Sequence, residues 1–157
     1  MSSMSPARAV AESAEWSAVF VEQFGVIGEE IGLPRTMTRL LGWLVVCDPP
    51  YQSAQQIQAG LRLSAGSVST GMNDLVRGGL AERLTFPGDR HVYYRIGPDG
   101  WRGFLAGRLR VLGEIRRIAD RAMAAAGDLA DSRLQDLRDF YARSEQLFTK
   151  LLEQPGS

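Results

Sequence analysis

Cysteine and histidine are almost absent from this sequence. One cysteine, Cys47, and one histidine, His91, occur among 157 residues. A single thiol cannot form an internal disulfide, and neither residue type is frequent enough for a zinc cluster or a catalytic triad. Cys47 ends an apolar run over residues 40–47, where we expect a buried, inert thiol. No phosphate-binding glycine loop is present either. We therefore expect no metal, no cofactor and no enzymatic activity.

Long hydrophobic runs are also missing. No stretch reaches the ~18 apolar residues of a membrane span, and the N-terminus lacks the basic-then-apolar order of a signal peptide. We therefore expect a soluble, cytoplasmic protein with no membrane partner.

Neither sign of charge is in excess, with 18 basic and 18 acidic residues. The basic residues gather in the middle, however. Residues 53–127 hold eleven Arg and six acidic residues, whereas residues 1–33 hold one Arg and five Glu. The neutral overall charge argues against a protein that coats DNA nonspecifically. The basic middle segment is nevertheless compatible with a DNA partner.

Residues 53–96 carry the most informative local pattern. Ser53 is placed to cap a short helix that we expect to end at Gly60. Ser64 is placed to cap a second helix, which the glycine pair at 78–79 should stop. Its apolar positions recur at steps of three and four, at Val68, Met72, Leu75 and Val76. The spacing predicts two helices joined at a steep angle, as in a helix-turn-helix.

The other face of the second helix carries small polar side chains. A solvated helix would normally carry Glu, Lys or Gln there, because these residues favour the helical state more strongly. Small residues let a helix N-terminus approach a DNA groove, and an Asn can pair bidentately with adenine. The alternative is a capped, serine-rich surface helix. The candidate major-groove residues are Ala65, Gly66, Ser67, Ser69, Thr70 and Asn73.

A predicted hairpin follows the two helices. Residues 80–86 and 92–96 have strand composition and flank a turn over residues 87–90. A hairpin directly after a helix-turn-helix forms a wing, whose tip would offer Arg90 and His91 to a phosphate or the minor groove. Taken alone, each of these two side chains could equally be a solvated surface residue.

The run from Gly32 to Tyr94 resembles the GbsR-like branch of the MarR superfamily of winged-helix transcriptional regulators. The matching motifs are GLPR, the DPP before the first short helix, SxGSVS opening the second, GL after it, and PGDR with YY in the wing. In place of the Asp-x-Arg common in MarR relatives, Asp89 is followed by Arg90 and His91, so both stay candidates for the minor groove. Arg62, Arg77 and Arg90 are the candidates to hold phosphates or the minor groove.

We expect a single domain over residues 12–153, mainly α with a small β-hairpin wing (α+β). A winged helix-turn-helix at 34–96 is flanked by dimerisation helices at 12–32 and 98–153, with flexible ends at 1–11 and 154–157. The last two helices are too long for the winged unit to cover their apolar faces, which favours a homodimer. An antiparallel hairpin within one chain is the alternative. The candidate interface residues are Trp16, Phe20, Leu134, Leu137, Tyr141, Phe148 and Leu151.

The predicted function is a homodimeric transcriptional regulator that binds an inverted-repeat DNA operator. The resemblance implies repression and a small quaternary ammonium effector such as choline. Such a cation would need an aromatic cage, for which Trp16, Trp43, Tyr51 and Trp101 are candidates, although core packing would explain them too. The alternative function is a winged-helix protein-interaction module without sequence-specific DNA binding.

Overall fold

The computed structural model describes residues 6–155, and the side chains of residues 14–155. The chain divides between Pro98 and Asp99 into two compact units, which are described separately below. Together they contain six α-helices, one short 3₁₀ helix and three strands, which confirms the predicted mainly helical fold with a small β-hairpin. The elements are α1 (Pro6–Glu30), α2 (Arg35–Val46), β1 (Gln52–Ser53), α3 (Ala54–Leu61), α4 (Ala65–Arg77), β2 (Ala81–Leu84), β3 (Tyr93–Ile96), α5 (Gly100–Ala126), η1 (Gly127–Leu129) and α6 (Ser132–Glu153).

The ends differ from the prediction in one respect. Helix α1 begins at Pro6, six residues before the predicted start at residue 12. Residues 1–5 and 156–157 of the predicted flexible ends lie outside the described part of the chain. None of the described helices is long and apolar enough to cross a membrane.

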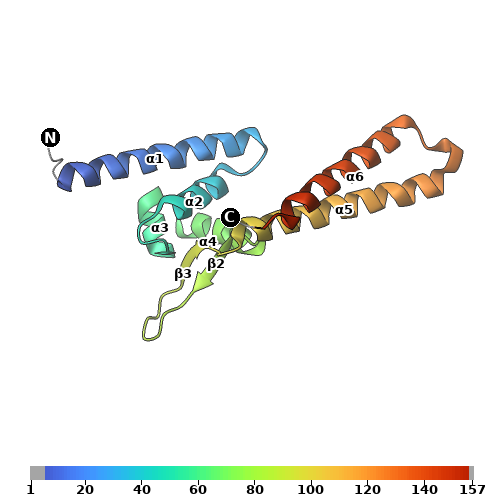
Figure 1. Cartoon of the computed structure of the whole chain (residues 1–157). Helices are drawn as coiled ribbons and strands as arrows, with labels where there is room; N and C mark the ends of the chain where they lie inside the picture. The colour runs from blue at the N-terminus through green and yellow to red at the C-terminus, as the bar shows by residue number, and fades with distance from the viewer. Residues whose placement is uncertain (1–5, 156–157) are drawn as a thin grey trace. The chain divides into compact units, whose positions relative to one another are not determined.

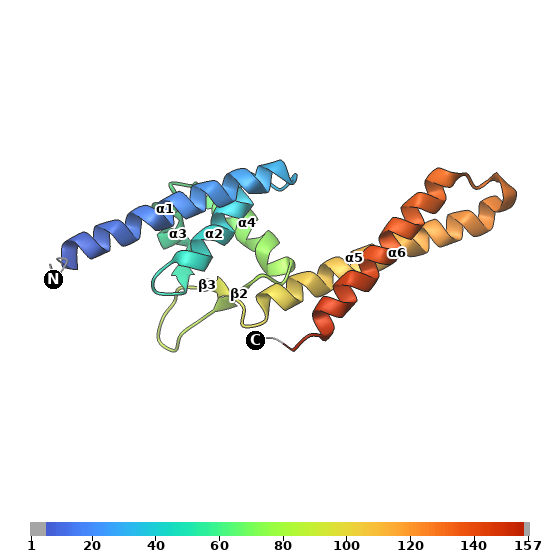
Figure 2. The same cartoon turned by 45° about the horizontal axis from the view of Figure 1, so that its top comes forward.

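The core of the first unit lies where α2, α3 and α4 meet (Figures 1 and 2). Its largest fully buried side chains come from all three helices: Leu40, Ile57, Val68, Met72 and Leu75. Burying such side chains contributes about 1.5–3 kcal/mol each, so this cluster holds the helix-turn-helix together. Helix α1 packs along α2, with Gly28 directly against Thr38.

Local capping chemistry sets the short helix α3. The Ser53 hydroxyl accepts from the Gln56 N–H at 3.2 Å, while Gln56 Oε1 accepts from the Ser53 N–H at 2.8 Å, which completes a capping box. The predicted end of this helix at Gly60 is wrong. The helix continues to Leu61, and Arg62 adopts the left-handed conformation that ends it, with φ of 53°.

Gly60 instead allows a close approach. A Cβ atom at this position would lie 2.2 Å from Cη2 of the Trp43 ring, so only glycine lets α2 and α3 pack this closely. The sequence pattern indicated a glycine terminator, whereas tertiary packing explains the residue.

Three short strands form an antiparallel sheet in the order β1-β3-β2. Strand β1 was not predicted from the sequence; its two residues pair with Tyr93 and Tyr94. Strands β2 and β3 are shorter than predicted, at 81–84 and 93–96 rather than 80–86 and 92–96. Phe86 leaves the ladder to pack on Tyr51, and Pro87 has no N–H to donate to it.

The second unit is a helical hairpin in which α5 and α6 run antiparallel (Figures 1 and 2). Gly127 ends α5 with φ of 54°, and the Asp131 carboxylate caps α6 by accepting from two backbone N–H groups. The predicted alternative of an intramolecular hairpin is therefore present.

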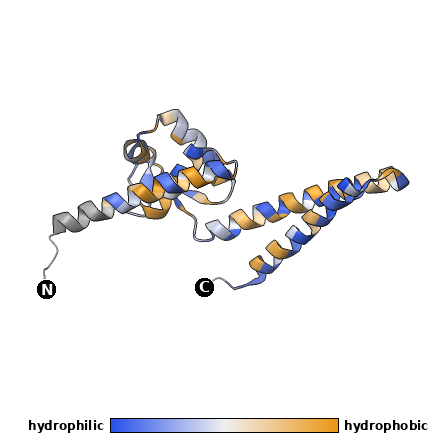
Figure 3. Cartoon of the chain, turned by 90° about the horizontal axis from the view of Figure 1, so that it is seen from above, coloured by the Kyte–Doolittle hydropathy of each residue, from blue (hydrophilic) through white to orange (hydrophobic). Residues whose placement is uncertain are grey.

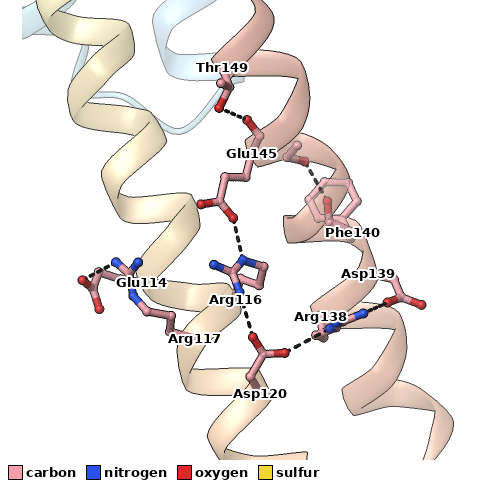
Figure 4. A network of polar contacts seen from close by, with 10 residues as sticks. Glu114, Arg116, Arg117, Asp120, Arg138, Asp139, Phe140, Glu145 and Thr149 are labelled. Carbon is pink, nitrogen blue, oxygen red and sulfur yellow. Dashed lines mark hydrogen bonds and ion pairs between the residues drawn. The ribbon is translucent and has the colours of Figure 1, made fainter.

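Ion pairs connect the two helices of the hairpin (Figure 4). Arg116 of α5 lies between Glu145 of α6, at 2.6 Å, and Asp120, at 2.8 Å. Asp120 in turn binds Arg138 of α6 at 3.0 Å. No residue of α6 is fully buried, so this hairpin has no closed apolar core in the single chain.

Candidate nucleic-acid interface

Helix α4 presents two chemically distinct faces. Its apolar side chains Val68, Met72 and Leu75 are buried in the core, exposed by 2% or less. Of the six candidate major-groove residues, only Ser67 is half-buried. The other five lie on the exposed face: Ala65, Gly66, Ser69, Thr70 and Asn73. The structure therefore brings the predicted residues together on one open surface, which we call the α4 face.

The start of α4 is open to close approach. The Ser64 hydroxyl accepts from the Ser67 N–H at 3.1 Å and donates to the Ser67 hydroxyl at 2.9 Å, so these two groups cap the helix. Apart from the adjacent backbone of α4, no atom of the described residues lies within 4 Å of where a Cβ would stand on Gly66. A groove of about 390 Å³ lies beside it, lined from α4 and from the start of α2 by residues that include Thr36 and Thr70.

The arginines around the α4 face differ in their partners. Arg77 pairs with Asp74 one turn earlier at 3.2 Å, and 78% of its side chain is exposed. Arg62 and Arg90 are exposed. Neither Arg62 nor Arg90 belongs to any ion pair formed within residues 14–155, so their charges stand unneutralised there.

Asp89 organises the tip of the wing, which projects beyond β2 and β3 in Figure 1. Its carboxylate accepts from the Tyr93 hydroxyl at 2.6 Å and from the His91 N–H at 2.9 Å, and it contacts His91 Nδ1 at 2.7 Å. These hydrogen bonds lower the pKa of Asp89 to about 2, and the bond from Tyr93 has the largest effect. The same carboxylate raises the pKa of the Tyr93 phenol. Between Asp89 and His91, Arg90 is left exposed at the tip.

Arg83 is a residue of this surface that the sequence analysis missed. It lies on β2, and its Nη2 donates to Oδ1 of Asn73 on α4. Its guanidinium also lies over the ring of Tyr94, 5.9 Å from the centroid. Strand alternation alone could have placed Arg83 on the exposed side of the hairpin, but the contact with α4 depends on the tertiary fold.

The four aromatic residues of the candidate effector pocket lie on different elements. Trp43 packs over Gly60, and its buried Nε1–H has no hydrogen-bond partner among the residues described. The Tyr51 ring packs against those of Phe86, at 5.1 Å between centroids, and Tyr93, at 5.5 Å. Trp16 on α1 and Trp101 on α5 are more than half exposed. The cage stays a prediction.

The candidate dimer residues are partly uncovered in the single chain. Trp16, Leu137 and Leu151 are exposed by 54%, 44% and 51%. The remaining four are half-buried: Phe20, Leu134, Tyr141 and Phe148. Two further apolar side chains on α6 are more exposed still, Leu147 at 64% and Phe140 at 59%. Figure 3 shows hydrophobic residues distributed along both helices of the hairpin.

The single thiol of Cys47 lies at the C-terminal cap of α2 and is half-buried. Burial raises its pKa to about 11, so the thiol is protonated and unreactive at neutral pH.

The chain is similar to known transcriptional regulators. No family model matches the chain. The HTH-type transcriptional regulator MmpR5 of Mycobacterium tuberculosis (strain H37Rv) is 38% identical over 136 residues, which cover 85% of this chain and 82% of that protein. A crystal structure of a transcriptional regulator matches with a TM-score of 0.76 and 37% identity, over 87% of this chain and 95% of that one.

A cysteine-to-serine mutant of Escherichia coli MarR also matches, over 97% of this chain and 99% of its own. Its identity of 16% and TM-score of 0.42 are too low to carry an argument. The two relatives above 35% identity and the winged helix-turn-helix with its three-stranded sheet indicate the same family. The chain belongs to the MarR-type family of winged-helix transcriptional regulators.

Proposed function

We propose that this regulator binds an inverted-repeat DNA operator as a homodimer in the cytoplasm and acts as a repressor. The α4 face would lie in the major groove, and the wing tip would reach a phosphate or the minor groove. The observation that carries the proposal is the α4 face itself. Its small polar residues are exposed, while Val68, Met72 and Leu75 on the opposite face of the same helix are buried.

The small polar side chains of this face support DNA rather than solvent as its partner. Ser, Thr, Asn and Gly lower helix propensity, so a helix that only faced water would gain stability from Glu, Lys or Gln at these sites. Arg62 and Arg90 are exposed and lack a carboxylate partner among residues 14–155. Both could therefore neutralise phosphates without first breaking an ion pair.

The homodimer is supported by uncovered apolar surface on α6. Three of its side chains, Phe140, Leu147 and Leu151, are each more than half exposed in the single chain. Large exposed apolar patches indicate protein-interaction sites. A second copy supplies a matching surface through two-fold symmetry, which also presents two α4 faces to two half-sites.

Membership of the GbsR-like branch and a quaternary ammonium effector belong to the same proposal. They rest on the GLPR, SxGSVS and PGDR motifs of the sequence. Titration with choline and glycine betaine, followed through tryptophan fluorescence and operator affinity, tests the effector. A flat response of both signals at millimolar ligand contradicts it.

A winged-helix protein-interaction module is the second candidate, since the exposed apolar side chains of α6 would also serve one. The two functions differ in what the α4 face does. A mobility-shift assay with the full chain against fragments of its own genome separates them. Saturable binding to a subset of fragments supports the regulator, and equal binding to all fragments or to none supports the module.

The assignments on the α4 face and wing make a further testable prediction. Asn73→Ala should cost about 1–3 kcal/mol on the operator and leave nonspecific binding nearly unchanged, because only base contacts are lost. Arg90→Ala should weaken binding to all sequences and flatten the salt dependence, because a phosphate contact is lost. Mobility shifts at two salt concentrations measure both effects. Wild-type affinity in both variants would contradict the assignments.

A further inference from the structure

Asn73 and Arg83 form a polar pair that joins the recognition helix to the wing. Nη2 of Arg83, on β2, donates to Oδ1 of Asn73, on α4. The guanidinium is also held over the ring of Tyr94, its cross-strand neighbour in the sheet. Both members of the pair are exposed. The side chain of Arg83 is therefore oriented by two contacts while it faces solvent.

The charge of Arg83 sets it apart from its neighbours. Arg77 on α4 is paired with Asp74, and Arg95 on β3 is paired with Glu82. Within residues 14–155, Arg83 forms no ion pair and is held instead by a neutral amide. An exposed hydrogen bond of this kind contributes little to folding stability, since water satisfies both groups equally well. Its more direct consequence is to fix which atoms of the two side chains remain available to a partner.

Those remaining atoms are hydrogen-bond donors. Asn73 uses its carbonyl oxygen on Arg83, which leaves both hydrogens of its Nδ2 free. A guanidinium has five N–H donors and no acceptor, and Arg83 uses one of them here. The surface of the Asn73–Arg83 pair is thus rich in donors and positively charged.

Base chemistry then distinguishes the partners. In the major groove, guanine presents two acceptors, N7 and O6, whereas adenine presents one acceptor and one donor. Bidentate pairing of Asn with adenine needs the amide oxygen to accept from N6, and in this structure Arg83 already donates to that oxygen. A second donor brought to the same oxygen would also face the guanidinium. The donor set matches guanine and disfavours adenine.

We infer that the Asn73–Arg83 pair selects a guanine in each half-site of the operator, with Arg83 as a specificity-determining residue. This refines the expectation from sequence that Asn73 would pair with adenine. The inference rests on the proposed DNA binding, and its test separates the two.

The test begins with selection of binding sites from a pool of random duplexes by the full-length chain. The wild-type protein should enrich a repeated motif. Each half-site of this motif should contain one guanine that is selected only when the Asn73–Arg83 pair is intact. Asn73→Ala and Arg83→Ala should both lose preference at that position and keep the rest of the motif. The expected loss of discrimination is about 5- to 150-fold, the range for one good bidentate contact. Arg83→Lys, which keeps the charge but not the planar fork, should lose it as well.

Arg95→Ala is the matched control, since it removes an arginine from the same sheet at an ion-paired position. It should keep the guanine preference. Thermal unfolding of each variant checks that the fold survives, as expected for exposed side chains. Replacing the selected guanine by 7-deazaguanine removes one acceptor, and it should weaken wild type more than either alanine variant.

Four results decide between the inference and its alternatives. A guanine preference lost in Asn73→Ala and Arg83→Ala supports the inference. A motif with adenine at this position, or a guanine preference that Arg83→Ala leaves intact, overturns the inference and leaves DNA binding standing. Failure of wild type to enrich any motif overturns the proposed function and the inference with it.

Discussion

The conformation of the wing tip depends on the carboxylate of Asp89. It accepts hydrogen bonds from the Tyr93 hydroxyl and from the backbone of His91, and these contacts hold the turn that carries Arg90. The pKa of Asp89 is about 2, below the ordinary value of about 3.9 in an unfolded chain. The contribution of this ionised carboxylate to stability is therefore complete above about pH 4 and is lost as the pH falls towards 2.

We predict that Asp89→Asn lowers the pKa of Tyr93 towards the ordinary value of about 10, because the carboxylate that holds the phenolic proton is gone. It should also weaken operator binding by releasing the turn. An NMR titration of the Tyr93 ring and a mobility shift measure the two effects. Asp128→Asn, which removes an exposed carboxylate of η1 outside the α4 face and the wing, is the control. A Tyr93 pKa unchanged in Asp89→Asn would contradict the role of this contact.

Single residues differed in how far sequence could place them. The polar residues of the α4 face were predictable because helical periodicity separates them from Val68 and Met72. Arg83 was not, since its contact with Asn73 joins two elements whose relative position depends on packing. Gly60 looked like a terminator because glycine often ends helices, whereas here its missing side chain admits Trp43.

At the scale of elements, two glycines of α4 have opposite surroundings. A Cβ on Gly71 would lie 2.2 Å from Cδ1 of Leu40, a side chain with 0% exposure in the core. Beyond the neighbouring backbone of its own helix, a Cβ on Gly66 would meet no atom of the described residues within 4 Å. One glycine therefore lets α4 dock on α2, and the other leaves the start of α4 open.

This contrast gives a matched pair of variants. Gly71→Ala should destabilise the fold by about 1–3 kcal/mol through overpacking. Gly66→Ala should raise stability by up to about 1 kcal/mol through helix propensity, and yet weaken operator binding because the added methyl keeps the helix from the groove. Denaturant unfolding and mobility shifts measure both variants. If both variants raised, or both lowered, the free energy of unfolding, the packed position of Gly71 and the open position of Gly66 would be contradicted.

The helices were predictable as elements because caps and periodic apolar residues lie in the local sequence. Ser53, Ser64 and Gly127 mark boundaries that the structure confirms. Strand β1 was missed because two residues carry no periodicity, and only pairing with β3 defines them.

At the scale of the whole molecule, the exposed apolar residues of α6 predict self-association. Leu147→Glu should leave the single chain folded, because 64% of this side chain is already exposed, but it should bury a charge in the dimer. Sedimentation should then show a monomer with reduced operator affinity. Gln146→Glu adds the same charge at the neighbouring exposed position and should stay dimeric. A wild-type chain that is monomeric at micromolar concentration would contradict the dimer.

The most direct test of a dimeric, sequence-specific regulator is to sequence the fragments of its own genome that the full-length protein retains. Two α4 faces related by two-fold symmetry should retain fragments that share an inverted repeat, with half-site centres about one helical turn (~34 Å) or a multiple of it apart. Retained fragments with no common sequence, or with a single unrepeated site, would contradict the proposed function.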